Sequence, residues 1–400
     1  MRILHTCFTY WPCSDGVSVA MQRISEGLAS KGHEVTVATG FSAERTGVAE
    51  HNGVRIREFL LSGNEIQGYR GDVEGFTRFV RESDCEVMLN YAAQICTTDL
   101  VLPMLDELPF AKVIVPCGYS ALRDPTYAAY FARLPERLSH YDRAVYMSGS
   151  YQDKRFSDEH ALSNAVVIPN GASADEFDDL RTGFRQACGI TERYLFICVA
   201  NIMDLKGQRE VHQAFARSGV TDAALVFLGS EVSRFVTGAM RTLPGPLYTL
   251  RRRLNILRHE LIESKVSPGL NSRYDLASPA GTRTLVLAGV PRELVLAAYN
   301  EADLFVFGSK VECAPLVIHE TMAAGTPWIS FPVGNVPDLE GGTVVSDVAD
   351  MAREIRHLAG DDSERERLGA EGRSAWRVRY KWESIVEQYE GLYRELVDGA

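Results

Sequence analysis

Two carboxylates, Glu312 and Glu320, stand eight positions apart in the stretch of the chain whose residue types point most directly to chemistry. The apolar run 302–307 ahead of Glu312 predicts a buried strand, and Pro315 predicts the start of a helix that contains Glu320. The start of such a helix directs backbone amides and a partial positive charge outward, which suits a phosphate. Carboxylates on both sides of a phosphate would repel it unless each accepts hydrogen bonds from neutral hydroxyls. The pattern therefore indicates a ligand with hydroxyls at both ends of a diphosphate, as in a nucleotide sugar.

Each acid taken alone has a simpler interpretation. Glu320 would then be a solvated helix residue, and Glu312 a capping or loop residue. The joint pattern favours a binding site, because the acids occur together with a helix-starting proline, a helix end at 323–327 and a following strand at 328–331.

The composition is that of a globular protein with room for two domains. The chain has 400 residues, 46% of them hydrophobic and 24% charged. Its net charge of −11 disfavours nucleic acid and anionic membranes as partners. The eight cysteines show no Cys-x-x-Cys pair and no metal-ligand spacing, so we expect reduced thiols and no metal. Residues 1–8 are too short an apolar run for a signal peptide or a membrane span, and we expect a cytoplasmic protein.

The order of predicted elements indicates an α/β fold with two doubly wound units. A strand at 3–8, a helix over 17–31 and a strand at 34–39 form a βαβ unit, which implies a parallel sheet. Neither a G-x-G-x-x-G fingerprint nor a Walker A sequence occurs, which disfavours dinucleotide cofactors and P-loop chemistry. We predict the remaining strands at 86–89, 112–115, 144–147 and 166–168, and after an acidic segment at 175–179, at 194–199, 224–228, 284–287, 304–307 and 328–331.

Residues 230–281 interrupt this alternation. Three arginines at 251–253 begin a basic stretch that predicts a helix to 263, and 267–281 predicts a loop. A solvated helix face is the ordinary interpretation. The alternative is a lid, an oligomer contact or a weak peripheral contact with the inner face of a membrane.

Taken together, these features resemble the retaining glycosyltransferases of the family 4 type, which have the GT-B architecture. The resemblance runs over most of the chain and is strongest at 289–334. Its most specific motif is the E-x7-E element from Glu312 to Glu320, and the other matching pieces are the V-I-P-N-G run at 167–171, Lys206-Gly207 and Gly16.

The resemblance implies two Rossmann-like domains that face each other across a cleft. The acceptor-side domain would cover 1–172, and the nucleotide-sugar-binding domain would cover 173–379. A final helix at about 380–400, which contains Trp382, would cross back to the first domain.

The resemblance also implies a role for each matching residue. Glu320 would bind the ribose hydroxyls, while Glu312 and Lys206 would be the catalytic pair, at the transferred sugar and at the leaving diphosphate respectively. Gly16 would face the diphosphate from the other domain. Val290, after Gly289, would lie near the base. The diphosphate itself would bind the backbone of Cys313, Ala314, Pro315, Leu316 and Val317.

The implied function is transfer of a sugar, of the hexosyltransferase type, from a nucleotide-diphosphate sugar to a hydroxyl acceptor. The acceptor would be a glycan, a lipid-linked molecule or a small molecule. Retention by front-face attack needs no protein nucleophile. We expect no cofactor, and since no Asp-x-Asp occurs, we expect no divalent metal. A nucleotide-sugar hydrolase or epimerase on the same fold is an alternative within enzymes.

Three positions depart from the family pattern. Asn201 stands where an arginine is frequent, Cys117 where a histidine is frequent, and Asn90 at a strand end that often carries histidine. These departures keep a non-catalytic nucleotide-sugar-binding subunit open as a further alternative.

N-terminal loops at 62–75 and 119–134 would shape the binding site for the acceptor. These loops contain Tyr69, Tyr119, Tyr127 and Tyr130, which could stack on an acceptor or simply pack in the core.

Overall fold

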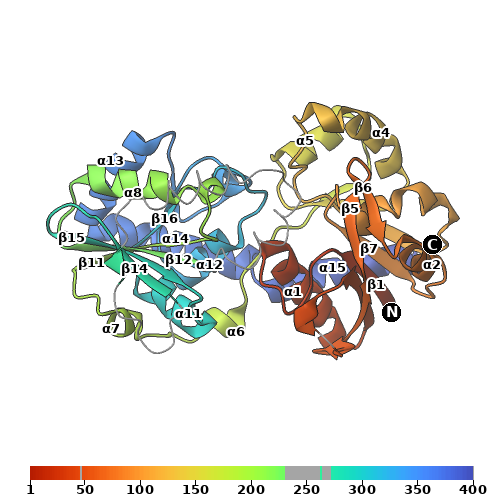
Figure 1. Cartoon of the computed structure of the whole chain (residues 1–400), viewed down its shortest axis with the longest axis horizontal. Helices are drawn as coiled ribbons and strands as arrows, with labels where there is room; N and C mark the ends of the chain where they lie inside the picture. The colour runs from red at the N-terminus through yellow and green to blue at the C-terminus, as the bar shows by residue number, and fades with distance from the viewer. Residues whose placement is uncertain (46, 230–261, 264–271, 400) are drawn as a thin grey trace. The chain divides into compact units, whose positions relative to one another are not determined.

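The computed structural model describes residues 1–45, 47–229, 262–263 and 272–399, which form two compact units. Unit 1 comprises Met1–Gly171, Cys313–Pro315 and Arg379–Ala400, and unit 2 comprises Ala172–Glu312 and Leu316–Val378. Each unit is built on one large, mainly parallel sheet with helices on both faces (Figure 1). The predicted α/β class with two Rossmann-like units is therefore confirmed.

The main sheet of unit 1 has the strand order β10-β9-β8-β7-β1-β2-β4-β3. Its pairs are parallel except for β3 with β4, and Ile3 on β1 lies opposite Val35 on β2. Its strands are β1 (Arg2–Cys7), β2 (Glu34–Gly40), β3 (Glu50–His51), β4 (Val54–Phe59), β7 (Val87–Tyr91), β8 (Ala111–Val115), β9 (Arg143–Tyr146) and β10 (Ala165–Val167). A separate hairpin consists of β5 (Leu61–Asn64) and β6 (Gly68–Gly71).

Alternate side chains of these strands pack on opposite faces of the sheet, as the period of a strand requires. Leu4, Met88 and Ile114 belong to a core that also contains Phe76 of α2 and Leu134 of α4. The helices of unit 1 are α1 (Gly16–Ser30), α2 (Val73–Arg81), α3 (Cys96–Asp99), α4 (Ala128–Ser139), α5 (Gln152–Glu159) and α15 (Trp382–Asp398), with 3₁₀ turns at Ala43–Arg45, Leu102–Glu107 and Pro125–Tyr127.

Helix α15 packs beside α1 on the other face of this sheet (Figure 1). The buried ring of His5 on β1 is 2.8 Å from Ser25 Oγ of α1 and 3.1 Å from the hydroxyl of Tyr393. Burial lowers the pKa of His5 to about 3, so the ring is neutral. The predicted return of the C-terminal helix to the N-terminal domain is therefore confirmed.

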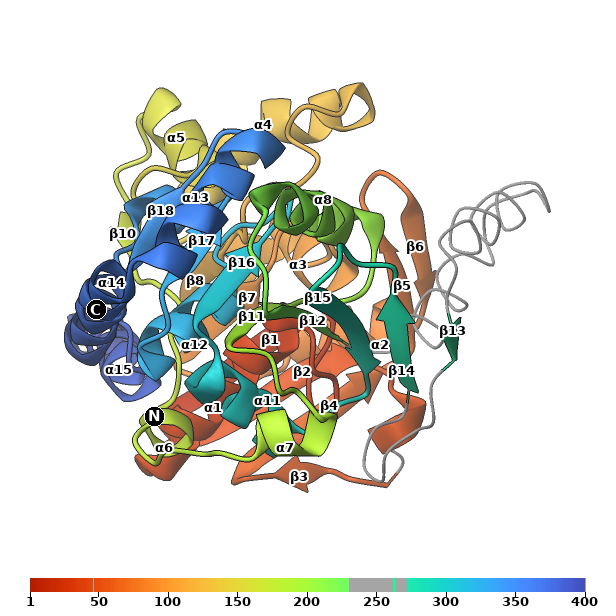
Figure 2. The same ribbon diagram turned by 90° about the vertical axis from the view of Figure 1, so that its left-hand side faces the viewer.

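The sheet of unit 2 has the order β13-β14-β15-β12-β11-β16-β17-β18. Strands β13 and β14 are antiparallel at one edge, where β14 pairs with β15 (Figure 2). The strands are β11 (Tyr194–Val199), β12 (Ala223–Gly229), β13 (Ile262–Glu263), β14 (Ser272–Leu276), β15 (Thr282–Ala288), β16 (Leu304–Phe307), β17 (Trp328–Ser330) and β18 (Gly342–Val344).

The predicted loop at 267–281 is wrong for Ser272–Leu276, which is the strand β14, paired antiparallel with both β13 and β15. Its sequence, S-R-Y-D-L, lacks the apolar run of a buried central strand, so the local pattern resembles that of a loop. Residues 230–261 and 264–271 lie outside the described residues. The predicted basic helix and the membrane or oligomer contact therefore stay predictions.

Helices α8 and α13 cover one face of this sheet, and α7 and α11 lie on the other (Figure 1). Val211 and Phe215 of α8 and Ile355 of α13 pack on Phe196 and Val306 of the sheet. The helices of unit 2 are α6 (Ala174–Phe177), α7 (Phe184–Cys188), α8 (Gln208–Ser218), α11 (Arg292–Glu301), α12 (Leu316–Ala324), α13 (Val348–Gly360) and α14 (Asp362–Arg379), with 3₁₀ turns at Asp204–Lys206 (η4) and Val336–Asp338. None of the helices in the described residues has the length and hydropathy needed to cross a bilayer.

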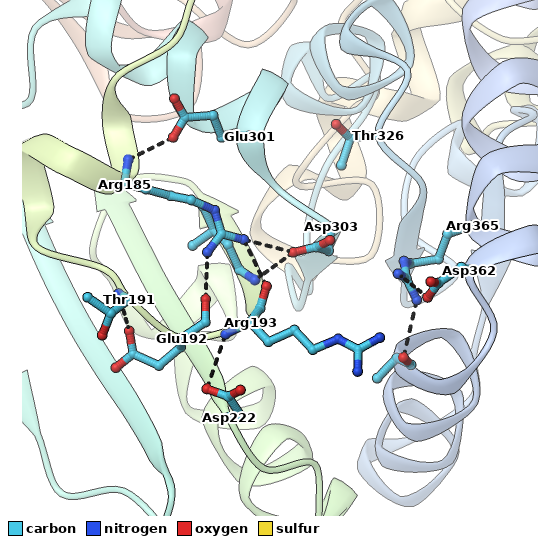
Figure 3. Close-up of polar contacts among 12 residues, drawn as sticks. Arg185, Thr191, Glu192, Arg193, Asp222, Glu301, Asp303, Thr326, Asp362 and Arg365 are labelled. Carbon is cyan, nitrogen blue, oxygen red and sulfur yellow. Dashed lines mark hydrogen bonds and ion pairs between the residues drawn. The ribbon is translucent and has the colours of Figure 1, made fainter.

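A polar cluster at the amino ends of β11 and β16 fixes these two central strands together (Figure 3). The guanidinium of Arg185 donates to Asp303 at 3.0 Å and to the carbonyl of Glu192 at 2.7 Å. Asp303 also accepts from the backbone of Leu195 at 2.8 Å, and Glu301 accepts from the backbone of Arg185 at 2.7 Å. Because the strands are parallel and locked at their starts, the loops that follow them leave the sheet side by side.

Candidate functional site

Glu312 and Lys206 meet at the carboxyl edge of the unit 2 sheet. Lys206 follows β11 and Glu312 follows β16, and the Lys206 ammonium is 2.6 Å from Oε1 of Glu312. The same oxygen accepts from the hydroxyl of buried Ser309 at 2.7 Å. The exposed fraction is 23% for the Lys206 side chain and 14% for Glu312, so solvent or a ligand reaches the pair from one side.

Two glycines allow these loops to approach so closely. Gly207 has φ +65°, and a β-carbon on it would lie 1.7 Å from the carbonyl oxygen of Gly308. A β-carbon on Gly308 would lie 2.5 Å from the carbonyl oxygen of Gly207. The backbone of Lys310 also donates to the carbonyl of Leu205 at 2.9 Å. Backbone therefore packs on backbone here, and this places Lys206 over Glu312.

Helix α12 begins at Leu316 directly after Pro315, where the sequence predicts a helix start, and ends before Gly325 at φ +77°. The first amides of a helix lack partners one turn back within that helix, which is the basis for anion binding at this end. Leu316 and Val317 provide these amides, and Glu320 follows in the second turn. The preceding Cys313–Pro315 groups with unit 1, where Asn170 Nδ2 donates to the carbonyl of Ala314 at 3.0 Å.

Glu320 has a hydrogen-bond donor on each of its oxygens. Oε1 accepts from Nη2 of Arg292 at 2.6 Å, and Oε2 accepts from the hydroxyl of Tyr299 at 2.8 Å. Arg292 also binds Glu176 of α6 through Nε at 3.1 Å and Nη2 at 2.8 Å. Helix α6 and the consecutive helices α11 and α12, which lie more than 100 residues later in the sequence, thus converge on one guanidinium.

The titration behaviour of this group follows from burial and charge. Burial first, and then the Glu320 carboxylate, raise the pKa of Tyr299 well above its usual value, so the phenol remains a hydrogen-bond donor. Burial by itself would lower the pKa of Arg292, but Glu320 and Glu176 together raise it above its ordinary value. Burial lowers the pKa of His319 to about 3, so this neighbour of Glu320 is a neutral ring.

Gly16 is the first residue of α1 in unit 1. Asp15 caps this helix, with Oδ1 accepting from the amides of Val17 and Ser18 at 3.1 Å each. A β-carbon on Gly16 would meet no atom within 4 Å, so neither space nor backbone conformation in the described structure requires glycine here. The absent side chain leaves open space beside the helix start.

Val290 lies between β15 and α11, two residues before Arg292. Its neighbour Gly289 has φ +65° and donates its amide to the carbonyl of Gly229 at 3.0 Å. The predicted donor-binding residues are thus divided: Lys206, Val290, Glu312, Leu316, Val317 and Glu320 belong to unit 2, and Gly16, Cys313, Ala314 and Pro315 to unit 1. Their contacts with a donor stay predictions.

The residues at the three departures from the family pattern do not replace the missing cationic groups. Asn90 is buried, donating to Thr6 Oγ1 at 2.6 Å and accepting from the Tyr141 hydroxyl at 2.7 Å, so its role is structural. Burial raises the pKa of the Cys117 thiol far above its usual value, so this side chain is neutral. Asn201 is an exposed amide that carries no charge.

The tyrosines of the predicted acceptor loops are mostly core residues. Tyr119, Tyr127 and Tyr130 are buried, and the rings of Tyr119 and Tyr130 pack edge-on against Phe131. Of the four, only Tyr69 is partly exposed. Tyr119, Tyr127 and Tyr130 therefore pack in the core, as the second of the two interpretations holds.

Sequence reasoning did not identify Arg292, Tyr299, Glu176 or Ser309. An arginine directly after Pro291 is a usable signal, because proline often marks a helix start and a cation there opposes the helix dipole. Glu176 is 116 residues from Arg292, and no local pattern reveals their pairing.

Comparisons with known proteins identify the fold and a local family match. Residues 268–361, which contain both acids, match the family model of the group 1 glycosyl transferases. Sucrose-phosphate synthase from Thermosynechococcus elongatus superimposes with a TM-score of 0.72, at 17% identity and full coverage of both chains. Anabaena Alr3699/HepE in complex with UDP gives 0.69, at 14% identity and coverage of 99% of this chain and 100% of that one. The chain has the GT-B fold. Units 1 and 2 are the two Rossmann-like domains of this GT-B protein.

Curated relatives match only part of the chain. A D-inositol 3-phosphate glycosyltransferase from Corynebacterium kroppenstedtii is 30% identical over 189 residues, 42% of each chain. A GDP-mannose-dependent alpha-(1-6)-phosphatidylinositol monomannoside mannosyltransferase from Mycolicibacterium smegmatis is 26% identical over 267 residues, 60% of each chain. The matches thus span 42% and 60% of these relatives' lengths.

Proposed function

We propose that this protein is a retaining glycosyltransferase that moves a sugar from a nucleotide-diphosphate donor to a hydroxyl acceptor without a metal ion. The observation that carries the proposal is the arrangement around α12. Glu312 precedes its start with Lys206 at 2.6 Å, and Glu320 follows in its second turn. A phosphate-binding helix start between two hydroxyl-binding carboxylates matches the three parts of a nucleotide sugar.

The donor binds along this arrangement, with each of its parts at a different group of residues. The ribose hydroxyls bind Glu320, the diphosphate binds the amides at the start of α12, and the hydroxyls of the transferred sugar bind Glu312. Val290 contacts the nucleotide base, and Gly16 contacts the diphosphate. Closure around the donor excludes water from the reacting bond.

The reaction proceeds by front-face attack. The acceptor oxygen forms a bond to the anomeric carbon as the bond from that carbon to the phosphate oxygen breaks. The acceptor proton passes to the departing phosphate, and the new bond lies on the same face as the old one. Negative charge grows on the leaving oxygens, so Lys206 and the oriented amides stabilise the transition state more than the ground state.

The comparisons support the substrate class rather than individual substrates. The Anabaena Alr3699/HepE structures contain UDP or UDP-glucose, and the mycobacterial relative is named as GDP-mannose-dependent. The names of the curated relatives include inositol phosphate and a phosphatidylinositol mannoside. We therefore propose a nucleotide-diphosphate hexose as donor and a polyol or glycan hydroxyl as acceptor.

The proposal is tested by assaying the purified full chain against a panel of nucleotide sugars, with and without polyol and glycan acceptors, in the presence of EDTA. NMR of the product should show a new glycosidic bond with the anomeric configuration of the donor. Inversion of configuration, or activity that EDTA abolishes, would contradict the mechanism. Free sugar without transfer would instead identify a hydrolase, and an isomeric nucleotide sugar an epimerase. Tight donor binding without turnover on any acceptor would identify a binding subunit.

A further inference from the structure

Arg292 occupies a position that the local structure of its helix disfavours. It is the first residue of α11, where the positive end of the helix dipole repels a cation. The residue before it, Pro291, provides no side-chain cap. The favourable interactions of this arginine must therefore come from outside its own helix.

Two carboxylates provide these interactions. Glu176 accepts from Nε and Nη2 of Arg292, and Glu320 accepts from Nη2 at 2.6 Å. The acids are largely buried, with side chains 17% and 13% exposed, whereas Arg292 is 41% exposed. Within the described residues, Nη1 of Arg292 has no hydrogen-bond partner. The guanidinium thus joins two acids and leaves the two N–H donors of Nη1 unused within the described residues.

The geometry at Glu320 leaves it able to bind a diol. An ionised carboxylate has about four lone-pair directions, two on each oxygen. Arg292 uses one on Oε1 and Tyr299 uses one on Oε2, so one direction remains on each oxygen. Both donors come from α11, and together they fix the plane of the carboxylate. The remaining two directions suit a pair of adjacent hydroxyls such as those of a ribose.

We propose that Arg292, with Tyr299, is a positioning residue for the nucleoside end of the donor, an inference that rests on the proposed function. Arg292 orients Glu320 towards the ribose. The remaining Nη1 donors then bind an acceptor atom of the nucleoside.

The test compares the binding of a nucleoside diphosphate with that of inorganic pyrophosphate by isothermal titration calorimetry. The wild-type full chain is first titrated with UDP, GDP and ADP, and the tightest of these is used for the variants. Arg292→Gln should lower the affinity for the nucleoside diphosphate at least about tenfold. Its affinity for pyrophosphate should change by less than about threefold. If Arg292 had a purely structural role, the substitution would weaken the binding of both ligands to the same extent, or of neither.

Two further variants separate orientation from charge. Arg292→Lys keeps the charge but cannot bridge two carboxylates with a planar fork, so it should not restore nucleoside diphosphate affinity. Full recovery with lysine would overturn the positioning role. Tyr299→Phe removes only the second donor and should also weaken the nucleoside diphosphate selectively. If Arg292→Gln does not fold, Tyr299→Phe decides the question.

A matched control is Arg367→Gln, because Arg367 pairs with Glu364 and Glu371 on the exposed face of α14. It should bind both ligands as the wild type does. Wild-type affinity in Arg292→Gln would overturn the inference about Arg292 and leave the proposed function standing. Failure of the wild type to bind any nucleoside diphosphate would overturn the proposed function, and this inference with it.

Discussion

Gly207 and Gly308 are in direct backbone contact, so that a β-carbon on Gly207 would lie 1.7 Å from the carbonyl oxygen of Gly308. The contact joins the loop after β11 to the loop after β16. Lys206 and Glu312 stand on these two loops, and their 2.6 Å ion pair depends on the approach that the glycines permit. The glycines therefore serve the placement of the candidate catalytic pair.

Gly207→Ala should disrupt this placement. The substitution combines an unfavourable φ with a backbone collision, and we expect a loss of roughly 2–4 kcal/mol in the free energy of unfolding, together with a large loss of turnover. Gly219→Ala is the control, because Gly219 has a similar φ of +70° but a β-carbon there would meet only Arg356, at 3.8 Å. It should cost about 1 kcal/mol and leave turnover unchanged. Equal effects of the two substitutions in urea unfolding and in turnover would contradict this account.

Lys206→Ala should slow turnover more than it weakens donor binding, since its charge acts mainly on the leaving diphosphate. A loss of kcat on the order of 10²–10³ is the usual effect of removing one such group. Lys310→Ala provides the control, because Lys310, in the loop that holds Glu312, forms a similar ion pair with Glu210 of α8. We expect near wild-type kinetics from Lys310→Ala, and a Lys206→Ala enzyme that kept its kcat would rule out the catalytic role.

Gly16→Ala should separate folding from function. The position is helical and unobstructed, so alanine should change the free energy of unfolding by no more than about 1 kcal/mol and in the stabilising direction. If the diphosphate approaches this backbone, the added methyl group should raise the KM for the donor. Measuring both quantities on one preparation checks the claim, and an unchanged KM would remove Gly16 from the donor site.

Glu390 of α15 should make the stability of unit 1 depend on pH. Hydrogen bonds from Arg394, Lys31 and His33 lower its pKa from 4.5 to about 2. A carboxyl with a depressed folded-state pKa contributes stability that is complete above its unfolded value and is lost as the pH falls from about 4.5 towards 2. Glu390→Gln should therefore be less stable than the wild type near neutral pH and approach it in acid. Urea unfolding at several pH values measures this, and a difference that stayed constant with pH would refute the assignment.

The central strands could be predicted from the sequence because they are buried on both faces. The run at 194–199 is apolar throughout, and the structure has β11 at Tyr194–Val199. Strand β4, which reads V-R-I-R-E-F, is absent from the prediction although its alternation is visible, and the sequence of β14 predicts a loop instead of a strand. Half-buried strands carry fewer apolar residues than strands buried on both faces, so their sequences resemble loops.

The candidate site also has a part that the sequence predicts and a part that it does not. Its two acids and the helix between them are local features, and their spacing in the sequence was sufficient to predict them. The contacts of Arg292 with Glu176 and of Gly207 with Gly308 join residues about a hundred positions apart. Such contacts depend on the order of strands in the sheet, which one sequence does not specify.

The central claim is that the start of α12 binds a diphosphate between two hydroxyl-binding acids, and a crystal structure of the protein soaked with its donor tests it most directly. We expect the diphosphate on the amides of Leu316 and Val317, the ribose hydroxyls on Glu320 and the sugar hydroxyls on Glu312. A donor bound elsewhere, with Glu312 and Glu320 making no contact to it, would contradict the account.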